Sequence, residues 1–215
     1  MRLPKGIDPF RQNFVKLRAT GIYWRSPMEF KIRKKSSVLA TFSAEIYGPE
    51  GQLIYTVWEE PGTLGKKIVR LTKWRTALSL KIAITEIISG KVYFLNRNPG
   101  IWREEYFVTG GDGATLFSFV PKRFDWRLFE RKWEIRDGYG EKIGIYHSGT
   151  LKILGPMEAR VTTLSGDEIS RLIWERPSFF RTPRECVVSV NDSRESWIMI
   201  SLTAAILKAL FFERR

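Results

Sequence analysis

Basic residues surround a single tryptophan in the segment from residue 66 to residue 81, which holds six Lys and Arg and no acid. Cations with an interleaved aromatic ring suit two anionic ligands: lipid headgroups, with the indole at the membrane interface, and single-stranded nucleic acid, with the indole stacked on bases. A third interpretation is structural, because lysines also block strand pairing along an exposed sheet edge. The residues predicted to bind lipid or another anion are Lys66, Lys67, Arg70, Lys73, Trp74 and Arg75.

A second basic patch lies near the start of the chain. Residues 1–35 contain ten Lys and Arg and two acids, so this segment and residues 66–81 together carry +14, and the rest of the chain carries −1 of the formal charge of +13. Such uneven charge predicts an anionic partner, which is phospholipid, nucleic acid or an acidic protein, although a solubilising surface gives the same pattern. The secondary patch comprises Lys31, Arg33, Lys34 and Lys35.

Residues that could carry catalysis are few, and we expect no enzyme activity, no metal and no cofactor. The lone histidine, His147, has no second histidine with which to hold zinc, and the lone cysteine, Cys186, precedes an apolar run that predicts a buried thiol. Residues 110–113 are glycine-rich but lack the Lys-Ser/Thr of a phosphate-binding loop, so they predict a hairpin turn. The pairs Glu59-Glu60 and Glu104-Glu105 point to opposite faces of a strand and cannot converge, so we assign both to the surface.

The elements that position these residues are mostly strands. Residues 45–59, 107–121, 134–148 and 161–175 share one pattern: a short apolar strand, a polar turn with glycine, and a second strand. Glycine supplies the positive φ of a hairpin turn, so the pattern predicts turns at Gly51, Gly113, Gly140 and Gly166. An aliphatic residue follows three positions after each glycine. We expect it to be the first inward residue of the return strand: Ile54, Leu116, Ile143 and Ile169.

The whole chain contains roughly ten to twelve such strands, with no strong linker between them, which predicts one domain over residues 28–215. Residues 1–27 form a basic N-terminal arm. Within it, Phe10, Phe14 and Leu17 fall at helical spacing and indicate a short amphipathic helix. The cations of this helix could meet an anionic surface, or the helix could pack across one end of the strands.

The C-terminal segment is apolar on every side. From Ser196 onward, Lys208 is the only charge before Glu213, and a helix without a polar face must be enclosed by protein or lipid. The run is shorter than the roughly 20 apolar residues of a spanning helix, so we expect a core helix over residues 194–213 inside the β-rich body. Asp192 and Glu195 predict its start, as N-cap and as capping-box partner.

A meander of roughly twelve strands that ends in an apolar helix resembles the tubby-like β-barrel superfamily, which includes the tubby C-terminal domain, the phospholipid scramblases and the plant LURP-one-related proteins. Met199-Ile200 and the terminal Phe211-Phe212-Glu213 are similar to the last segment of scramblases, and the hairpin at 134–144 is similar to the D-x-x-G repeats of the scramblase and LURP-one groups. The likeness covers about residues 28–215. It implies a mainly β fold: a closed antiparallel barrel of about twelve strands with a central hydrophobic C-terminal α-helix.

The resemblance also implies membrane association through anionic lipid, since tubby proteins bind a phosphoinositide headgroup in a basic groove. The calcium-binding segment of scramblases has a poor counterpart here. Residues 182–195 hold three carboxylates interleaved with Arg184 and Arg194, whereas calcium takes about six to eight oxygen ligands. The cysteine-rich palmitoylation cluster of scramblases also has no counterpart, because Cys186 is the only cysteine.

We therefore expect a non-enzymatic tubby-like, scramblase-like domain that binds anionic phospholipid headgroups peripherally. Two alternatives stay open. One is a structural or adaptor subunit that docks by its basic N-terminal arm onto a protein or nucleic-acid assembly, and the other is a membrane-inserted scramblase-like protein in which residues 197–213 cross the bilayer. A single cysteine and an N-terminus without the apolar stretch of a signal peptide predict a cytoplasmic location, with peripheral contact at a membrane.

Overall fold

The computed structural model describes residues 27–35, 42–60, 80–97, 105–122, 132–149, 157–175 and 184–212, with side chains as far as Leu210. These residues form twelve strands and a helix, α3, at Glu195–Phe212. The strands are β1 (Met28–Lys34), β2 (Ser43–Tyr47), β3 (Leu53–Glu59), β4 (Leu80–Glu86), β5 (Val92–Arg97), β6 (Tyr106–Thr109), β7 (Thr115–Pro121), β8 (Lys132–Asp137), β9 (Lys142–His147), β10 (Met157–Thr163), β11 (Glu168–Trp174) and β12 (Glu185–Val190).

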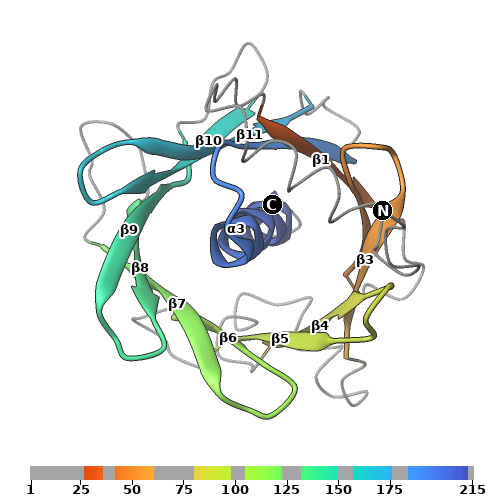
Figure 1. Cartoon of the computed structure of the whole chain (residues 1–215), viewed down its shortest axis with the longest axis horizontal. Helices are drawn as coiled ribbons and strands as arrows, with labels where there is room; N and C mark the ends of the chain where they lie inside the picture. Colours follow the sequence, from red (N-terminus) through yellow and green to blue (C-terminus); the bar gives the residue numbers. More distant parts are fainter. Residues whose placement is uncertain are drawn as a thin grey trace, which may run out of the picture.

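The strands form a closed antiparallel barrel in which each strand pairs with its sequence neighbours and β1 pairs with β12 (Figure 1). The closing register places Met28 opposite Val190 and Arg33 opposite Glu185. The predicted closed barrel with a central C-terminal helix is confirmed. Because each described strand has two partners, this sheet has no free edge for lysines to protect, and Lys81 lies in β4, which is paired on both sides.

Four hairpins share one hydrogen-bonded turn. In the β8–β9 hairpin, the N–H of Asp137 donates to the carbonyl of Glu141 at 2.9 Å, and the N–H of Gly140 donates to the carbonyl of Asp137 at 3.0 Å. The same two bonds recur in the β2–β3, β6–β7 and β10–β11 hairpins. The predicted turns are confirmed, because the φ angles of Gly51, Gly113, Gly140 and Gly166 are 77°, 84°, 84° and 99°.

A β-bulge follows each of these turns. Strand pairing skips one residue of the return strand in all four hairpins, and the skipped residues are Ile54, Leu116, Ile143 and Ile169. We expected these four to be the first inward residues. Ile169 is buried in the core, and Ile54 and Ile143 are half-buried and pack against it, so the exception is Leu116, which is 41% exposed. The bulge resets the alternation, and the residue one position later is buried in all four hairpins: Tyr55, Phe117, Gly144 and Ser170.

The two ends of the barrel differ in their connections. In an antiparallel meander, alternate connections lie at the same end. One end of the barrel, hereafter the hairpin end, holds the short hairpins 48–52, 86–91, 110–114, 137–141 and 163–167. The strands at the opposite end, hereafter the loop end, are joined through residues 36–41, 61–79, 98–104, 123–131, 150–156 and 176–183, which lie outside the described residues. Residues 1–26, with the expected arm helix, also lie outside them. They join β1 at the hairpin end, since Met28 is opposite Val190.

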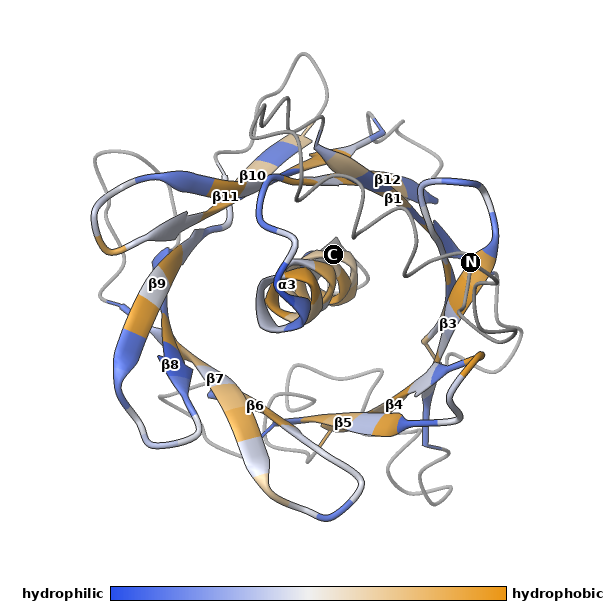
Figure 2. Ribbon diagram, viewed as in Figure 1, coloured by the Kyte–Doolittle hydropathy of each residue, from blue (hydrophilic) through white to orange (hydrophobic). Residues whose placement is uncertain are grey.

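The helix α3 runs inside the barrel (Figure 1), and most of its residues are hydrophobic (Figure 2). Its buried side chains and those of the strands form one hydrophobic core. Its bounds agree closely with the predicted core helix at 194–213. From Trp197 to Leu210 every side chain is buried except Ile198 and Lys208, which are half-buried. Near the hairpin end Trp197 packs against Gly144 of β9, and further along Lys208 donates to the carbonyl of Ser148, just after β9.

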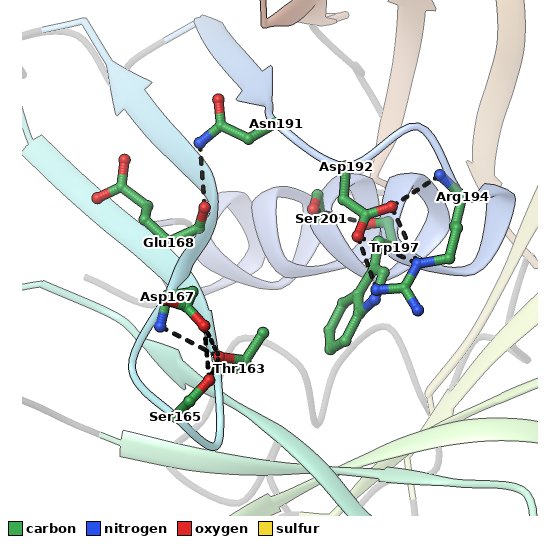
Figure 3. A network of polar contacts seen from close by, with 9 residues as sticks. All are labelled: Thr163, Ser165, Asp167, Glu168, Asn191, Asp192, Arg194, Trp197 and Ser201. Atoms are coloured by element: carbon green, nitrogen blue, oxygen red, sulfur yellow. Dashed lines mark hydrogen bonds and ion pairs between the residues drawn. The ribbon is translucent and has the colours of Figure 1, made fainter. Parts of the chain in front are cut away.

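The link into α3 differs from the predicted capping box. The carboxylate of Asp192 accepts the backbone N–H of Arg194 at 3.0 Å and its guanidinium at 2.7 Å (Figure 3). The carbonyl of Arg194 accepts the N–H groups of Trp197 and Ile198, so Arg194 and not Asp192 holds the N-cap position. Glu195 accepts the hydroxyl of Tyr93 at 3.4 Å. Asp192 therefore braces the residue that starts the helix.

Candidate functional site

The main predicted anion-binding residues fall in the connection between β3 and β4. Lys66, Lys67, Arg70, Lys73, Trp74 and Arg75 all lie outside the described residues. The described residues on either side, Glu60 and Leu80, are at the loop end. Beside them, Lys81 forms an ion pair of 2.7 Å with Glu60 and lies 4.3 Å from the centre of the Phe94 ring. The connection therefore leaves and rejoins the barrel at the loop end.

The secondary patch is divided between the two faces of β1. Lys31 and Arg33 point outward, and both pair with Glu185 of β12, at 2.6 Å and 2.8 Å. Lys35, on the same face, pairs with Glu45 at 2.5 Å. Lys34 occupies the alternate position and is half-buried at the loop end. Three of the four predicted residues thus share the outer face, and each has a carboxylate partner. The full set is Lys31, Arg33, Lys34 and Lys35.

These ion pairs shift the acid–base equilibria of the patch. Hydrogen bonding from Lys31 is the largest influence on Glu185, and with the contribution of Arg33 it holds the pKa of that carboxyl below its usual value despite partial desolvation. The hydrogen bond to Glu185 in turn raises the pKa of Arg33. Hydrogen bonds from Lys35 and Tyr47 lower the pKa of Glu45. An incoming anion must therefore compete with Glu185 and Glu45 for these cations.

A groove of about 430 Å³ opens on this face, between β1 and the β2–β3 turn. The guanidinium of Arg33 lies 5.8 Å from the centre of the Tyr47 ring, and the Tyr47 hydroxyl donates to Glu45 at 2.9 Å. The predicted set omitted Tyr47 and Val187, and the outward alternation of β12 was the signal that could have found Val187. The groove is lined by Glu29, Phe30, Lys31, Arg33, Tyr47, Gly48, Pro49, Gly51 and Val187.

Charge is divided unequally between the barrel and the rest of the chain. The described residues hold 16 of the 36 Lys and Arg and 18 of the 23 Asp and Glu, a net charge of −2. The remaining 20 cations and 5 acids, a net charge of +15, lie in the other residues. Of these, the six connections of the loop end hold 12 cations and 3 acids, and residues 1–26 hold 6 cations and 1 acid. The described part of the chain is therefore nearly neutral, and the basic character belongs to the segments attached to it.

The residues considered for catalysis lie on different strands. His147 is half-buried on the outer face of β9, with Nε2 3.4 Å from the hydroxyl of Thr162. Cys186 is buried in β12, and desolvation raises the pKa of its thiol well above the usual value. Among the described residues, no three His, Cys, Asp or Glu side chains are placed to hold one metal ion.

The glutamate pairs behave differently from each other. Glu59 and Glu60 do point to opposite faces, but the assignment of Glu59 to the surface is wrong. Its carboxylate is buried and accepts the backbone N–H of Phe42 at 3.0 Å. That N–H satisfies the carboxylate inside the barrel, which sequence spacing alone does not reveal. Glu105 is half-buried, and Glu104 lies outside the described residues.

The chain matches no protein-family model, and no curated protein or solved structure is significantly similar to it. Within the part of the chain that the structure describes, no helix is long and apolar enough to cross a membrane.

Proposed function

We propose that the chain is a non-enzymatic tubby-like domain that binds anionic phospholipid headgroups peripherally, through the connections at the loop end of its barrel. One observation carries the proposal: the strand topology gathers at a single end six connections that hold 12 Lys and Arg and 3 acids, on a barrel whose described residues have a net charge of −2. Concentrated positive charge on one side of a nearly neutral body favours binding to an extended negative surface over general solubility.

The architecture supports the family part of the proposal. A closed antiparallel barrel of twelve strands with a helix through its centre is what the resemblance to tubby-like and scramblase-like proteins implies. The position of the helix also bears on the membrane-inserted alternative. A spanning helix presents its side chains to lipid, whereas those of α3 face the barrel wall. Peripheral contact requires no such rearrangement.

The β3–β4 connection is the proposed centre of the site, because it holds five cations and no acid. Each Lys or Arg close to an anionic membrane contributes about 1 kcal/mol, so these five contribute about 5 kcal/mol, a weak and reversible attachment. Trp74 adds an indole that suits the interface between headgroups and acyl chains. Lys34 and Lys35 stand at the same end, two strands from β3. Screening by salt weakens all of these contributions together.

The test is co-sedimentation of the full chain with phosphatidylcholine vesicles that contain phosphatidylserine or a phosphoinositide, at low and high salt. The first variant changes the cations of the β3–β4 connection to serine. The control variant removes the same charge from described residues away from the loop end. The first set is Lys66, Lys67, Arg70, Lys73 and Arg75, and the control set is Lys91, Arg136, Lys142, Arg160 and Arg171.

We expect binding that falls with salt, disappears in the first variant and persists in the control. An equal loss in both variants would mean that net charge alone attracts the protein to vesicles. Absence of binding at low salt would overturn the proposal and direct attention to the adaptor alternative, in which the basic arm docks onto a protein or nucleic-acid assembly.

A further inference from the structure

Large apolar side chains stand in solvent at the tips of the hairpins. Tyr139 is 96% exposed in the β8–β9 turn, Ile88 is 81% exposed in the β4–β5 turn, and Leu164 is 54% exposed in the β10–β11 turn. Leu116 is also exposed, beside the β6–β7 turn. The β6–β7, β8–β9 and β10–β11 hairpins are successive along the rim, so three of these side chains follow one another on one side of it. Single exposed apolar residues are ordinary on a protein surface, so it is the grouping of these side chains at one end of the barrel that points to a partner surface.

The same end of the barrel is negatively charged. Its five hairpins and the link 191–195 hold eight acids and two cations, a net charge of −6. Among the described residues, only Asp192 of these acids forms an ion pair, with Arg194. The acids are Glu50, Glu86, Asp112, Asp137, Glu141, Asp167, Asp192 and Glu195.

Some of these carboxylates have a structural use within their own turns. Asp137 accepts the N–H groups of Tyr139 and Glu141, and Asp112 accepts that of Ala114. Such bonds stabilise a turn but do not neutralise its charge. On the barrel wall the pattern is the opposite, because Glu134 has three cations within 4 Å and Glu185 has two. The carboxylates of the hairpin end therefore keep their negative potential, whereas those of the wall are neutralised by neighbouring cations.

One segment of the chain has both the charge and the attachment point to cover this surface. Residues 1–26 hold six Lys and Arg, one Asp and the apolar residues Phe10, Phe14 and Leu17. They join the barrel at Met28, which pairs with Val190, directly before the link 191–195. Asn191 in turn bonds to Ile169 and Glu168 at the base of the β10–β11 hairpin (Figure 3). The arm thus starts within two strands of the hairpin that carries Leu164.

We propose that residues 1–26 dock on the hairpin end of their own barrel, with their cations against the unpaired carboxylates and their apolar side chains against the exposed tips. Tethering favours this occupant over a free partner, because it turns docking into an intramolecular event at high effective concentration. Phe14 lies fourteen positions before Met28, a length that spans up to about 50 Å when extended, so the rim is within reach. An anionic membrane is repelled by the same net charge of −6.

The docked arm has a consequence for partner binding that does not depend on lipid. Its cations are engaged by the barrel, so they are withheld from other anions until the contact opens. The basic charge available to a partner then comes from the loop end alone. This inference stands or falls separately from the proposed lipid function, because its surface lies at the opposite end of the barrel.

The experiment uses the full chain with a spin label attached at Asn13→Cys. Cys186 is buried, so the label goes to the new thiol. We expect the amide signals of Ile88, Tyr139 and Leu164 to broaden at least fivefold more than those of Lys81 and Lys122 at the loop end. High salt and the variant Glu50→Gln/Glu141→Gln/Tyr139→Ser/Leu164→Ser should abolish the difference. The matched control Glu105→Gln/Glu175→Gln/Trp58→Ser/Ile173→Ser, which changes residues away from the hairpin end, should retain it.

Three results would overturn the proposal. Broadening centred on the loop end would place the arm elsewhere, and equal broadening of both ends would mean that the arm has no preferred site. The third is broadening that appears in a mixture of spin-labelled chains and isotope-labelled chains without a spin label, since the arm would then bind a second copy. Each result is independent of whether the protein binds vesicles.

Discussion

The indole ring of Trp197 lies against the backbone of Gly144, at the point where α3 enters the barrel. A Cβ at Gly144 would stand 3.1 Å from the indole ring and 2.6 Å from the carbonyl oxygen of Thr162. The absence of a side chain in β9 is therefore what allows the largest residue of the helix to pack against the wall.

Substitution Gly144→Ala should destabilise the protein. The new methyl group meets a backbone carbonyl that cannot move without disturbing the β9–β10 pairing, so we expect a loss of about 1–3 kcal/mol in the free energy of unfolding by urea. Gly111→Ala is the matched control, because its nearest neighbour would be 3.5 Å away, an ordinary contact. Equal losses in the two variants would contradict a specific role for the Gly144–Trp197 contact.

Substitution Ala204→Arg should unfold the domain. Ala204 is completely buried, and an uncompensated charge in such a place costs about 3–5 kcal/mol, a large part of the stability of a typical domain. We expect loss of the near-ultraviolet circular dichroism signal and aggregation on expression. Ser196→Arg, on an exposed position of the same helix, should leave the spectrum unchanged. A folded and soluble Ala204→Arg protein would mean that α3 does not occupy the lumen.

Stability should fall in acid partly through Glu185. Its pKa is lowered in the folded state by Lys31 and Arg33, so its contribution is present above the unfolded-state pKa of about 4.3 and is lost as pH falls through the lower folded-state value. We expect Glu185→Gln to reduce the drop in melting temperature between pH 5 and pH 3. High salt should shrink the difference. Glu175→Gln, at an exposed carboxylate directly after β11, serves as control and should leave the drop unchanged.

The thiol of Cys186 should be inert in the native protein. It is buried in β12, and burial raises its pKa, so little reactive thiolate forms at neutral pH. We expect no reaction with a thiol reagent such as Ellman's reagent until denaturant unfolds the barrel, and then complete reaction of one thiol per chain. Rapid labelling without denaturant would mean that β12 separates from its neighbours in the native state, and would reopen the question of thiol chemistry.

Much of the fold could be predicted because its signals are local. Gly51, Gly113, Gly140 and Gly166 mark turns that need positive φ, and the apolar run after Ser196 marks a helix that must be enclosed. The aliphatic residue three positions after each glycine was a correct signal for an inward residue at Ile54, Ile143 and Ile169, and a wrong one at Leu116. Leu116 and its equivalents are the bulged residues, and a bulge changes strand pairing without changing the pattern of apolar letters.

Other features depend on partners distant in sequence. Glu59 is buried because the N–H of Phe42 reaches its carboxylate across the sheet, and no local pattern specifies that bond. Asp192 carries the residue type of an N-cap, but the same side chain can bond to the N–H two residues on, and that alternative occurs. For the candidate site, the sequence shows where the Lys and Arg residues lie along the chain. The strand topology shows at which end of the barrel the connections that carry them are attached. The six residues around Trp74 stay a prediction, since they lie outside the described structure.

The pairing of β1 with β12 also bears on how the protein is made. Arg33 and Glu185, which bond across this seam, are 152 residues apart, so the first strand waits for nearly all the others before it gains its second partner. α3 is synthesised after all twelve strands, although it fills their centre. Contacts of such long range fold slowly, and until they form the apolar lining of the nascent barrel has nothing to cover it. We expect protection of that lining on the ribosome, rather than the stability of the finished barrel, to limit the yield of folded protein in the cell.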